Sequence, residues 1–506
     1  MTALAVSLAF SANVSADNDF GLKVEKLLNA KSEKYFGFKK PLTDSASSSV
    51  IREDGQNAYD LVSVAKGLKA KILTRQAANK ADMFAFWPNE EVPSHLVFCI
   101  EGGTEDLGRT LPETGIAKLN PSIQTINIKT GAVKTVLRGM NRCDGIRTTA
   151  WGTILATEEA GDGQAYELID LLHTSNHTVT NRATGSIIDA SGVTSTTVVK
   201  RASLPTMSWE GLTVTSDGVV IAGDELRPGD AGDNRDGGAL FKFVPETPHT
   251  GGLISNLSDS PLVSGSTYAL QVQCKSGGNR GFGQGCEVGG GEWVSVNPES
   301  ARNDADANGA TGYYRPEDLH ADPVYTGQGI RFCWTNTGRE GNHNFGEVMC
   351  GIDATPLNVN ISAGAAQPIV NRFIEGDMDF NSIDNLAFQP RTGNLYVIED
   401  HSNGDVFACL PDGADRNIKS DGCVKVLSVK DQSAEPTGFG FTYNGKIAVL
   451  SIQHSNDDAC TDETDCAKVD DYGTDDIVVI SGFKVKSSQL NYAADDDDEN
   501  EDQNDD

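Results

Sequence analysis

The sequence predicts an all-β fold, a six-bladed β-propeller with long inserted loops, on the basis of three observations. Glycine is abundant, with 53 residues among 506, which exceeds its usual share of about 7%. From about residue 81 onward, apolar runs of strand length alternate with glycine turns, as they do in β-hairpins. About six copies of this hairpin unit follow one another at roughly 50 to 65 residues, a spacing typical of propeller blades.

Acidic residues mark both open ends of the repeated hairpins. One unit runs from Glu210 through Asp217-Gly218 to Asp224 and Glu225. The first strand of an antiparallel hairpin begins beside the end of the second, so blades around one axis would gather these acids at one channel mouth. Such close carboxylates repel each other and need cations. The pattern predicts a site for several metal ions, with the candidate ligands Glu158, Glu159, Glu210, Asp224, Glu225, Glu317, Asp384, Glu399, Asp400 and Glu435.

Two other interpretations of the acidic pattern are open at this stage. Acids that follow strands are common in surface turns, and calcium can staple a propeller without any catalysis. A second acidic segment, Asp304-Ala-Asp306-Ala-Asn308-Gly309, matches the first half of an EF-hand loop. Its twelfth position is Arg315 rather than glutamate, so a complete EF-hand site is not expected.

The ends of the chain differ in composition from its body. Residues 3–12 are apolar and Val14-Ser15-Ala16 resembles a cleavage site, so residues 1–16 are interpreted as a signal peptide with a truncated start. Residues 17–80 are expected to form an N-terminal extension that packs on a propeller of residues 81–486. Residues 487–506 are expected to be a disordered acidic tail, because such a composition cannot bury a core.

The charge balance excludes two classes of partner. The chain has 41 basic and 72 acidic residues, a formal net charge of −31. Duplex nucleic acid and anionic lipid would both be repelled. The sequence also lacks a run of about 20 apolar residues, so no transmembrane helix is expected.

The ten cysteines support an exported protein. Four pairs are close in sequence and bracket turn-rich segments, as short disulfide loops do in secreted proteins: Cys274/Cys286, Cys333/Cys350, Cys409/Cys423 and Cys460/Cys466. This leaves Cys99, inside an apolar strand, as a core residue. Cys143 lies in a Gly/Asp loop, which is a better place for a free, liganding thiolate.

Five segments, in order over about residues 80–485, resemble the PhoX-type alkaline phosphatases. Asn141-Arg-Cys-Asp-Gly with TTAWGTILATEE is similar to the family's NCAGG and PWGTWLTCEE, and Ser208-Trp-Glu210 resembles RFSHE. Tyr314-Arg-Pro-Glu317 resembles F-x-RPEG. The segments DNLAFQPRTGNLYVIEDHS (384–402) and AEPTGFGFTYNGKIAVLSIQH (434–454) are similar to two further family motifs.

The resemblance implies a six-bladed propeller with a central cofactor of Fe³⁺ and Ca²⁺ that hydrolyses phosphate monoesters, and in some relatives diesters. It implies that Cys143 binds iron and that Arg315 contacts phosphate. The acids Glu158 or Glu159, Glu210, Glu317 and Asp400 match metal-binding motifs. The expected protein is a phosphatase of small phosphate esters that is secreted, periplasmic or on the cell surface. It is also expected to be a monomer.

The chain departs from the family pattern near the substrate. Cys99-Ile-Glu101 stands where the family has Asn-His-Glu, and Arg142 stands where it has asparagine. Trp209 replaces a histidine, and Asp318 replaces a glycine. Lys134 or Arg138 is a candidate for a second phosphate contact. The alternatives are a calcium-dependent lactonase or phytase-like hydrolase, and a non-catalytic, calcium-stabilised binding propeller.

Overall fold

The computed structural model describes most of the chain between residues 20 and 485. The described residues are 20–47, 50–53, 55–229, 236–272, 287–359, 368–411, 422–455, 468–469 and 472–485. The expected signal peptide, the acidic tail and the pairs Cys274/Cys286 and Cys460/Cys466 lie outside them.

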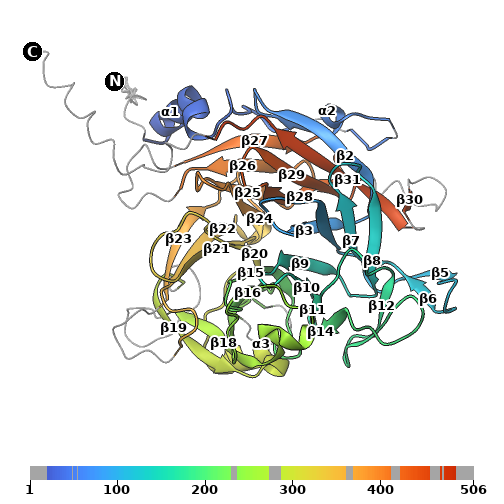
Figure 1. The fold of residues 1–506 in the computed structure, drawn as a ribbon. Coiled ribbons are helices and arrows are strands. Elements are labelled where there is room, and N and C mark those ends of the chain that lie inside the picture. Colours follow the sequence, from blue (N-terminus) through green and yellow to red (C-terminus); the bar gives the residue numbers. More distant parts are fainter. Residues whose placement is uncertain are drawn as a thin grey trace, which may run out of the picture.

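Strands dominate the described residues and form an all-β, propeller-like arrangement of sheets around a common centre (Figure 1). One sheet contains β3 (Ala81–Trp87), β4 (His95–Ile100), β7 (Pro121–Asn127), β8 (Val133–Arg138), β12 (His177–Asn181) and β13 (Ser186–Ile188). A second sheet contains β9 (Cys143–Thr148), β10 (Ile154–Glu158), β11 (Ala165–Leu168) and β14 (Val198–Lys200). A third sheet contains β24 (Ile383–Phe388), β25 (Leu395–Glu399), β26 (Asp405–Cys409), β27 (Cys423–Val429) and β1 (Val62–Val64). A fourth contains β28 (Glu435–Phe441), β29 (Ile447–Gln453), β31 (Tyr472–Ser481) and β2 (Lys69–Ala78).

The largest sheet has two halves that are joined at their outer edges by the pairing of β19 with β23. One half is β15 (Trp209–Val214), β16 (Val220–Asp224), β17 (Leu240–Pro245), β18 (Gly265–Val272) and β19 (Gly289–Val296). The other half is β20 (Pro316–Ala321), β21 (Ile330–Asn336), β22 (Glu347–Asp353) and β23 (Ile369–Glu375). Strands β18 and β19 lie within residues 251–312, a segment rich in glycine, asparagine and serine.

The remaining elements are short or peripheral. Helix α1 (Phe20–Tyr35) packs on β27, and no helix in the described part of the chain is long and apolar enough to cross a membrane. Helix α2 (Ala58–Leu61) is short, and strand β1 begins directly after it. The others are α3 (Ala301–Ala307), η2 (Leu257–Asp259), η3 (Pro261–Val263), η4 (Pro298–Ser300), η5 (Glu340–Asn342), β5 (Asp106–Thr110), β6 (Ala117–Leu119) and β30 (Lys468–Val469).

The innermost strands close into a ring. Contacts run from β3 to β9, β15, β20, β24 and β28 in turn, and β28 contacts β3 again. An early strand and the last strand of the described chain meet in one sheet, because β2 pairs antiparallel with β31. Strand β2 precedes the boundary expected at residue 81, so part of the expected extension is an edge strand of a propeller sheet. This pairing holds the ring closed.

Apolar side chains fill the space between neighbouring sheets. Tyr396 of β25 stacks on Phe439 and meets Phe441 edge to face, and Phe483 packs against both Tyr396 and Phe441. Aromatic side chains bury the largest apolar areas, and such ring pairs add about 0.5 to 1.5 kcal/mol beyond burial. The sheets are thus held rigidly enough to position side chains at the ring axis.

Candidate active site

A β-bulge recurs at the inner end of the first strand in the hairpins of the described residues. Two residues of the first strand oppose one residue of the second in β3–β4, β9–β10, β15–β16, β20–β21, β24–β25 and β28–β29. Bulges re-aim a side chain without breaking the sheet. The first of the two bulged residues is an acid in five of these hairpins and a glycine, Gly438, in β28. The acids are Asp82, Asp144, Glu210, Glu317 and Asp384.

A second set of side chains comes from the residue after each second strand. Four of these residues are acids, Glu101, Glu159, Glu225 and Asp400, and Glu435 opens β28. Together with the five acids at the bulges they form the axial acid cluster. Its members interact with one another through charge repulsion, and some also through side-chain hydrogen bonds. The expected gathering of hairpin-end carboxylates at one place is therefore present in the structure.

Two triads of the cluster have the spacing of metal ligands. Asp144, Glu159 and Glu210 offer oxygens that all lie within 4.8 Å of one another, and so do Glu210, Glu317 and Asp384. Glu210 belongs to both triads, so it could bridge two neighbouring cations.

Burial and mutual repulsion raise the pKa of most acids in the cluster. Burial first, and then the charge of Asp144 and Glu317, raise the pKa of Glu210 well above its usual value. Burial raises the pKa of Glu317 to about 8, although Arg315 opposes the rise. Burial and Glu101 raise the pKa of Asp82 to about 7. The carboxylates alone therefore disfavour full ionisation, and bound cations would relieve this cost.

The donor set fits hard cations. Oδ1 of Asp144 and Oε2 of Glu317 are buried and have no hydrogen-bond partner in the described part of the chain. An orphaned buried carboxylate oxygen is costly unless an ion or water engages it. Calcium takes six to eight oxygen ligands, mainly carboxylates. The residues present thus fit calcium-class cations.

Two arginines lie within the axial acid cluster. Nε of Arg315 is 2.5 Å from Oε1 of Glu225 and 2.6 Å from Oε1 of Glu317, and Nη1 is 3.2 Å from Oδ2 of Asp400. Nη1 of Arg142 is 3.5 Å from Oε2 of Glu159. The Arg142 side chain is 44% exposed, so it faces solvent at the rim of the cluster.

Three of the expected ligands turn away from the cluster and satisfy structural partners. Glu158 binds Arg182 and accepts from the backbone N–H of Asn141. Asp224 pairs with Arg302. Glu399 is the third of these expected ligands. In each pair of neighbouring acids the first residue still belongs to the strand and the second follows it. Because successive side chains of a strand face opposite sides, only Glu159, Glu225 and Asp400 reach the cluster.

Glu399, the third of these expected ligands, is likewise held by protein donors. Its carboxylate accepts from the backbone N–H groups of Asn381 and Asp405 and contacts His401 at 3.3 Å. These are contacts within its own sheet. The interpretation of Glu158, Asp224 and Glu399 as metal ligands thus disagrees with the structure, since their oxygens are occupied by protein donors.

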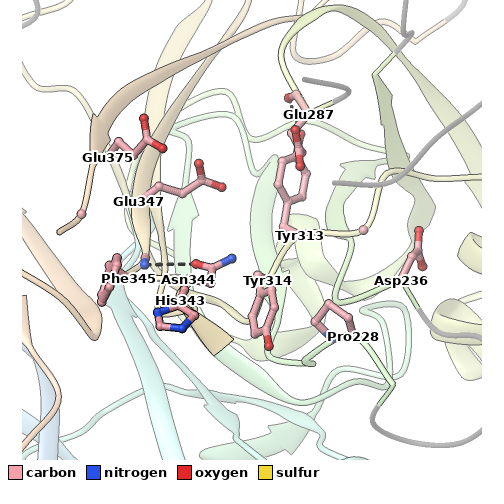
Figure 2. A pocket seen from close by; sticks show the side chains of 13 residues that line it. Pro228, Asp236, Glu287, Tyr313, Tyr314, His343, Asn344, Phe345, Glu347 and Glu375 are labelled. Atoms are coloured by element: carbon pink, nitrogen blue, oxygen red, sulfur yellow. Dashed lines mark hydrogen bonds between the residues drawn. The ribbon is translucent and has the colours of Figure 1, made fainter. Parts of the chain in front are cut away.

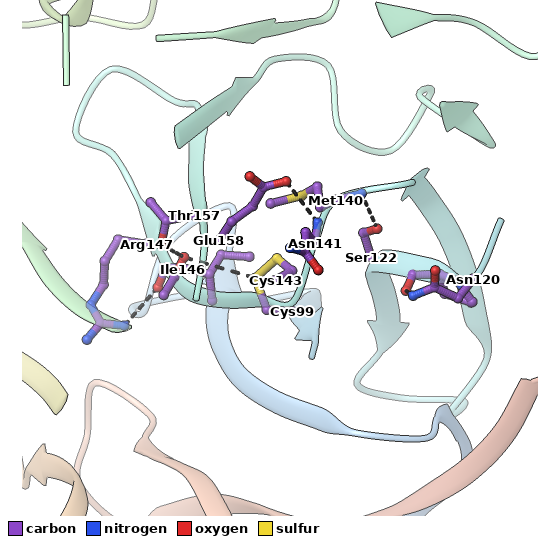
Figure 3. Close-up of a disulfide and its surroundings, with 12 residues drawn as sticks. Cys99, Asn120, Ser122, Met140, Asn141, Cys143, Ile146, Arg147, Thr157 and Glu158 are labelled. Carbon is purple, nitrogen blue, oxygen red and sulfur yellow. Dashed lines mark hydrogen bonds between the residues drawn. A yellow bond between two sulfur atoms is a disulfide. The ribbon is translucent and has the colours of Figure 1, made fainter. Parts of the chain in front are cut away.

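Cys143 is not the free thiolate that the loop sequence suggested. It forms a disulfide with Cys99, with an S–S distance of 2.00 Å (Figure 3). Both residues are fully buried. Two of the expected local disulfides, Cys333–Cys350 and Cys409–Cys423, are present. The contact between Cys99 and Cys143 was missed because it joins two sheets across 44 residues of sequence.

Other candidates lie away from the axial acid cluster. Nζ of Lys134 donates to the carbonyl of Leu172, and Arg138 donates to Leu119 and Asn176. The acids of the half EF-hand motif, Asp304 and Asp306, lie in helix α3 rather than in a loop. The indole N–H of Trp209 donates to the carbonyl of Pro205.

Two cavities open near the ring. A pocket of about 340 Å³ is lined by Tyr314, the neighbour of Arg315, together with Tyr313, Glu347 and Glu375 (Figure 2). A larger cavity of about 630 Å³ is lined by first-strand residues beyond the bulges, among them Arg147 and His320. The acid cluster thus lies at one end of the first strands, and the larger cavity follows those strands away from it.

A propeller-like ring with buried, cation-fitting carboxylates at its centre defines a propeller protein with a candidate metal centre. Residues 112–456 match the family described as alkaline phosphatase PhoX. The chain belongs to this family and is therefore an alkaline-phosphatase-like phosphoric ester hydrolase.

A solved structure with a TM-score above 0.5 shows the same fold. Pseudomonas fluorescens PhoX in complex with vanadate, a transition state analogue, matches with a TM-score of 0.54 and 14% identity, over 88% of this chain and 98% of that chain. A gluconolactonase of Xanthomonas campestris, XC5397, has a TM-score of 0.38 and 12% identity, over 87% of this chain and 96% of that chain. Among curated proteins none matches.

Proposed function

We propose that this chain is an exported, monomeric phosphatase that hydrolyses small phosphate monoesters at an axial metal centre in a six-bladed propeller. The axial acid cluster, with Arg315 inside it, is the observation that carries the proposal. Six blades are supported by the closed order of contacts among β3, β9, β15, β20, β24 and β28. Export is supported by the disulfides, which persist in oxidising compartments.

The proposed metal ligands are the two triads that share Glu210. Calcium-class cations suit these oxygen donors, and when bound they would polarise the phosphoryl group. The iron ion that was expected beside them would lack its thiolate, because Cys143 is in a disulfide. The remaining acids, such as Glu225 and Asp400, would balance the arginine charges and hold the guanidinium groups in place.

Arg315 is proposed to bind the phosphoryl oxygens. Its guanidinium is held on two sides, by Glu225 and Glu317 at Nε and by Asp400 at Nη1. A planar fork of donors matches phosphate geometry and keeps its charge at any working pH. Arg142, at the exposed rim, would meet an entering phosphate first. This position is asparagine in the resembled motif, so Arg142 supplies a charge that the motif does not.

Phosphate release from 4-nitrophenyl phosphate in excess Ca²⁺ tests the function. Activity on this monoester above that on bis(4-nitrophenyl) phosphate and on a lactone would support the proposal. A calcium-loaded, folded chain that cleaves none of the three would contradict it and favour a binding propeller.

Arg315→Ala is expected to lower kcat/KM for the monoester by roughly 10²- to 10³-fold, because it removes donors aimed at the charge that develops on phosphate. Arg331→Ala is the matched control. Arg331 also pairs with an acid, Asp322, at 2.8 Å, but on β21 outside the cluster, so kcat/KM should stay unchanged. Equal kinetics in Arg315→Ala and wild type would refute the assigned role.

A further inference from the structure

We infer that the axial centre of this chain is an oxygen-only centre for calcium-class cations, in which the Cys99–Cys143 disulfide replaces an iron–thiolate bond. The inference rests on the proposed function, since it concerns the same centre. It differs from the cofactor of iron and calcium that the family resemblance implies. The argument has three steps: the state of the sulfurs, their position, and the donors that remain.

The sulfur chemistry excludes a thiolate ligand in this state. Only a thiolate, with its negative charge, is a metal ligand of the kind that binds iron through cysteine. Both cysteines are fully buried, among the apolar side chains of Met83, Ile123 and Met140. The disulfide is neutral and belongs to this apolar cluster; Met140 and Ile146 of the cluster are seen near it in Figure 3.

The position of the disulfide ties it to the axial acid cluster. Cys143 directly precedes Asp144, and Cys99 precedes Glu101 by two residues. The bond therefore joins the two neighbouring hairpins that deliver these acids, β3–β4 and β9–β10. Cys143 matches the cysteine of the resembled family motif, whereas Cys99 stands where that motif has asparagine. The chain's own departure thus supplies the partner that removes the thiolate.

The donors that remain are carboxylate oxygens. The triads around Glu210 contain only aspartate and glutamate, and Nε1 of Trp209, before Glu210, is engaged elsewhere. Hard oxygen ligands in this number suit calcium, whereas thiolate favours softer metals and iron–sulfur centres. The disulfide also fixes the spacing of Asp144 and Glu101 by a covalent link, a task that a metal–sulfur bond would otherwise perform.

The test compares three full-length proteins purified without reductant: wild type, Cys99→Ser, and the double variant Cys99→Ser/Cys143→Ser. Each is supplied with Fe³⁺ and Ca²⁺ and freed of excess metal. The readouts are elemental metal content, the visible absorption of a thiolate–iron bond, and titration of free thiols after denaturation. Thermal melting verifies that each variant is folded.

Wild type is expected to hold calcium, to be colourless, and to show no free thiol at Cys99 or Cys143. Cys99→Ser leaves Cys143 as a free thiol beside Asp144 that loses its proton when it binds a metal, so iron content and visible absorption should rise at least about tenfold. The double variant, which has no thiolate there, should stay colourless. If Cys99→Ser alone fails to fold, the double variant still tests the inference, because it and wild type should then both contain calcium and no iron.

Two results would overturn the inference. One is wild type that carries stoichiometric iron with thiolate absorption; the other is a folded Cys99→Ser variant that stays colourless with added iron. Failure of the proposed function would look different, namely a colourless, calcium-loaded wild type without phosphate release. An active but coloured wild type would contradict the disulfide inference and leave the phosphatase proposal standing.

Discussion

Glu210→Gln is expected to reduce phosphate-ester hydrolysis at least about 100-fold and to remove bound cations. Glu210 supplies an oxygen to both triads, with Asp144 and Glu159 on one side and Glu317 and Asp384 on the other. Glutamine has the same shape but no charge, so both cation positions lose a carboxylate at once. Even the loss of an indirect metal partner typically costs 10- to 100-fold in affinity or activity, and a shared direct ligand should cost more.

The metal content and the kinetics of Glu210→Gln are the measurements that check this. Asp224→Asn is the matched control, because Asp224 is buried on the same hairpin but binds Arg302 instead of the cluster. It should lose about 2 kcal/mol of stability with its charged hydrogen bonds and keep its cations. If Glu210→Gln retained wild-type metal content while Asp224→Asn lost it, the division between cluster and structural acids would be wrong.

The propeller-like fold could be predicted from the sequence, and so could the gathering of acids from the ends of several hairpins. Glu210, Glu317 and Asp384 open first strands, and their hairpins are recognisable by local turn signals. Local signals cannot tell which of two neighbouring acids, such as Glu158 and Glu159, faces the axis. That choice depends on where the strand ends and the bulge falls, which pairing across the sheet decides.

Other features of the site depend on contacts that no local pattern records. Asp82 was missed because its hairpin with β4 has no glycine turn, although Asp144 and Glu101 were visible as acids of the repeat. The pairing of Cys99 with Cys143 requires two sheets to meet. The role of Arg142 was hidden because a loop arginine is usually solvated, whereas the ring places this one 3.5 Å from Glu159.

Removing all cations is expected to lower the melting temperature markedly. A cation present at 100 times its Kd stabilises the folded state by about 2.7 kcal/mol, so two sites contribute about 5 kcal/mol. For a chain of this length the unfolding entropy is roughly 1 kcal/mol per kelvin, which converts the loss into about 5 °C. Calorimetry of chelated and then dialysed protein, with and without added Ca²⁺, measures the shift, and Glu210→Gln should show much less of it.

The size of this loss should depend on pH in a defined direction. Without cations, burial raises the pKa of Glu317 from 4.5 to about 8 and that of Asp82 from 3.8 to about 7. The unfolded chain releases these protons at about pH 4 to 5, whereas the folded chain keeps them, so folding loses stability as pH rises from there to about 8. The cation-free protein should therefore melt at a lower temperature at pH 8.5 than at pH 5.5, while calcium restores more stability at the higher pH. A cation-free melting temperature that rises over this interval would show that burial and mutual repulsion do not raise the pKa of these carboxyls in the folded chain, and the metal centre would lose its electrostatic basis.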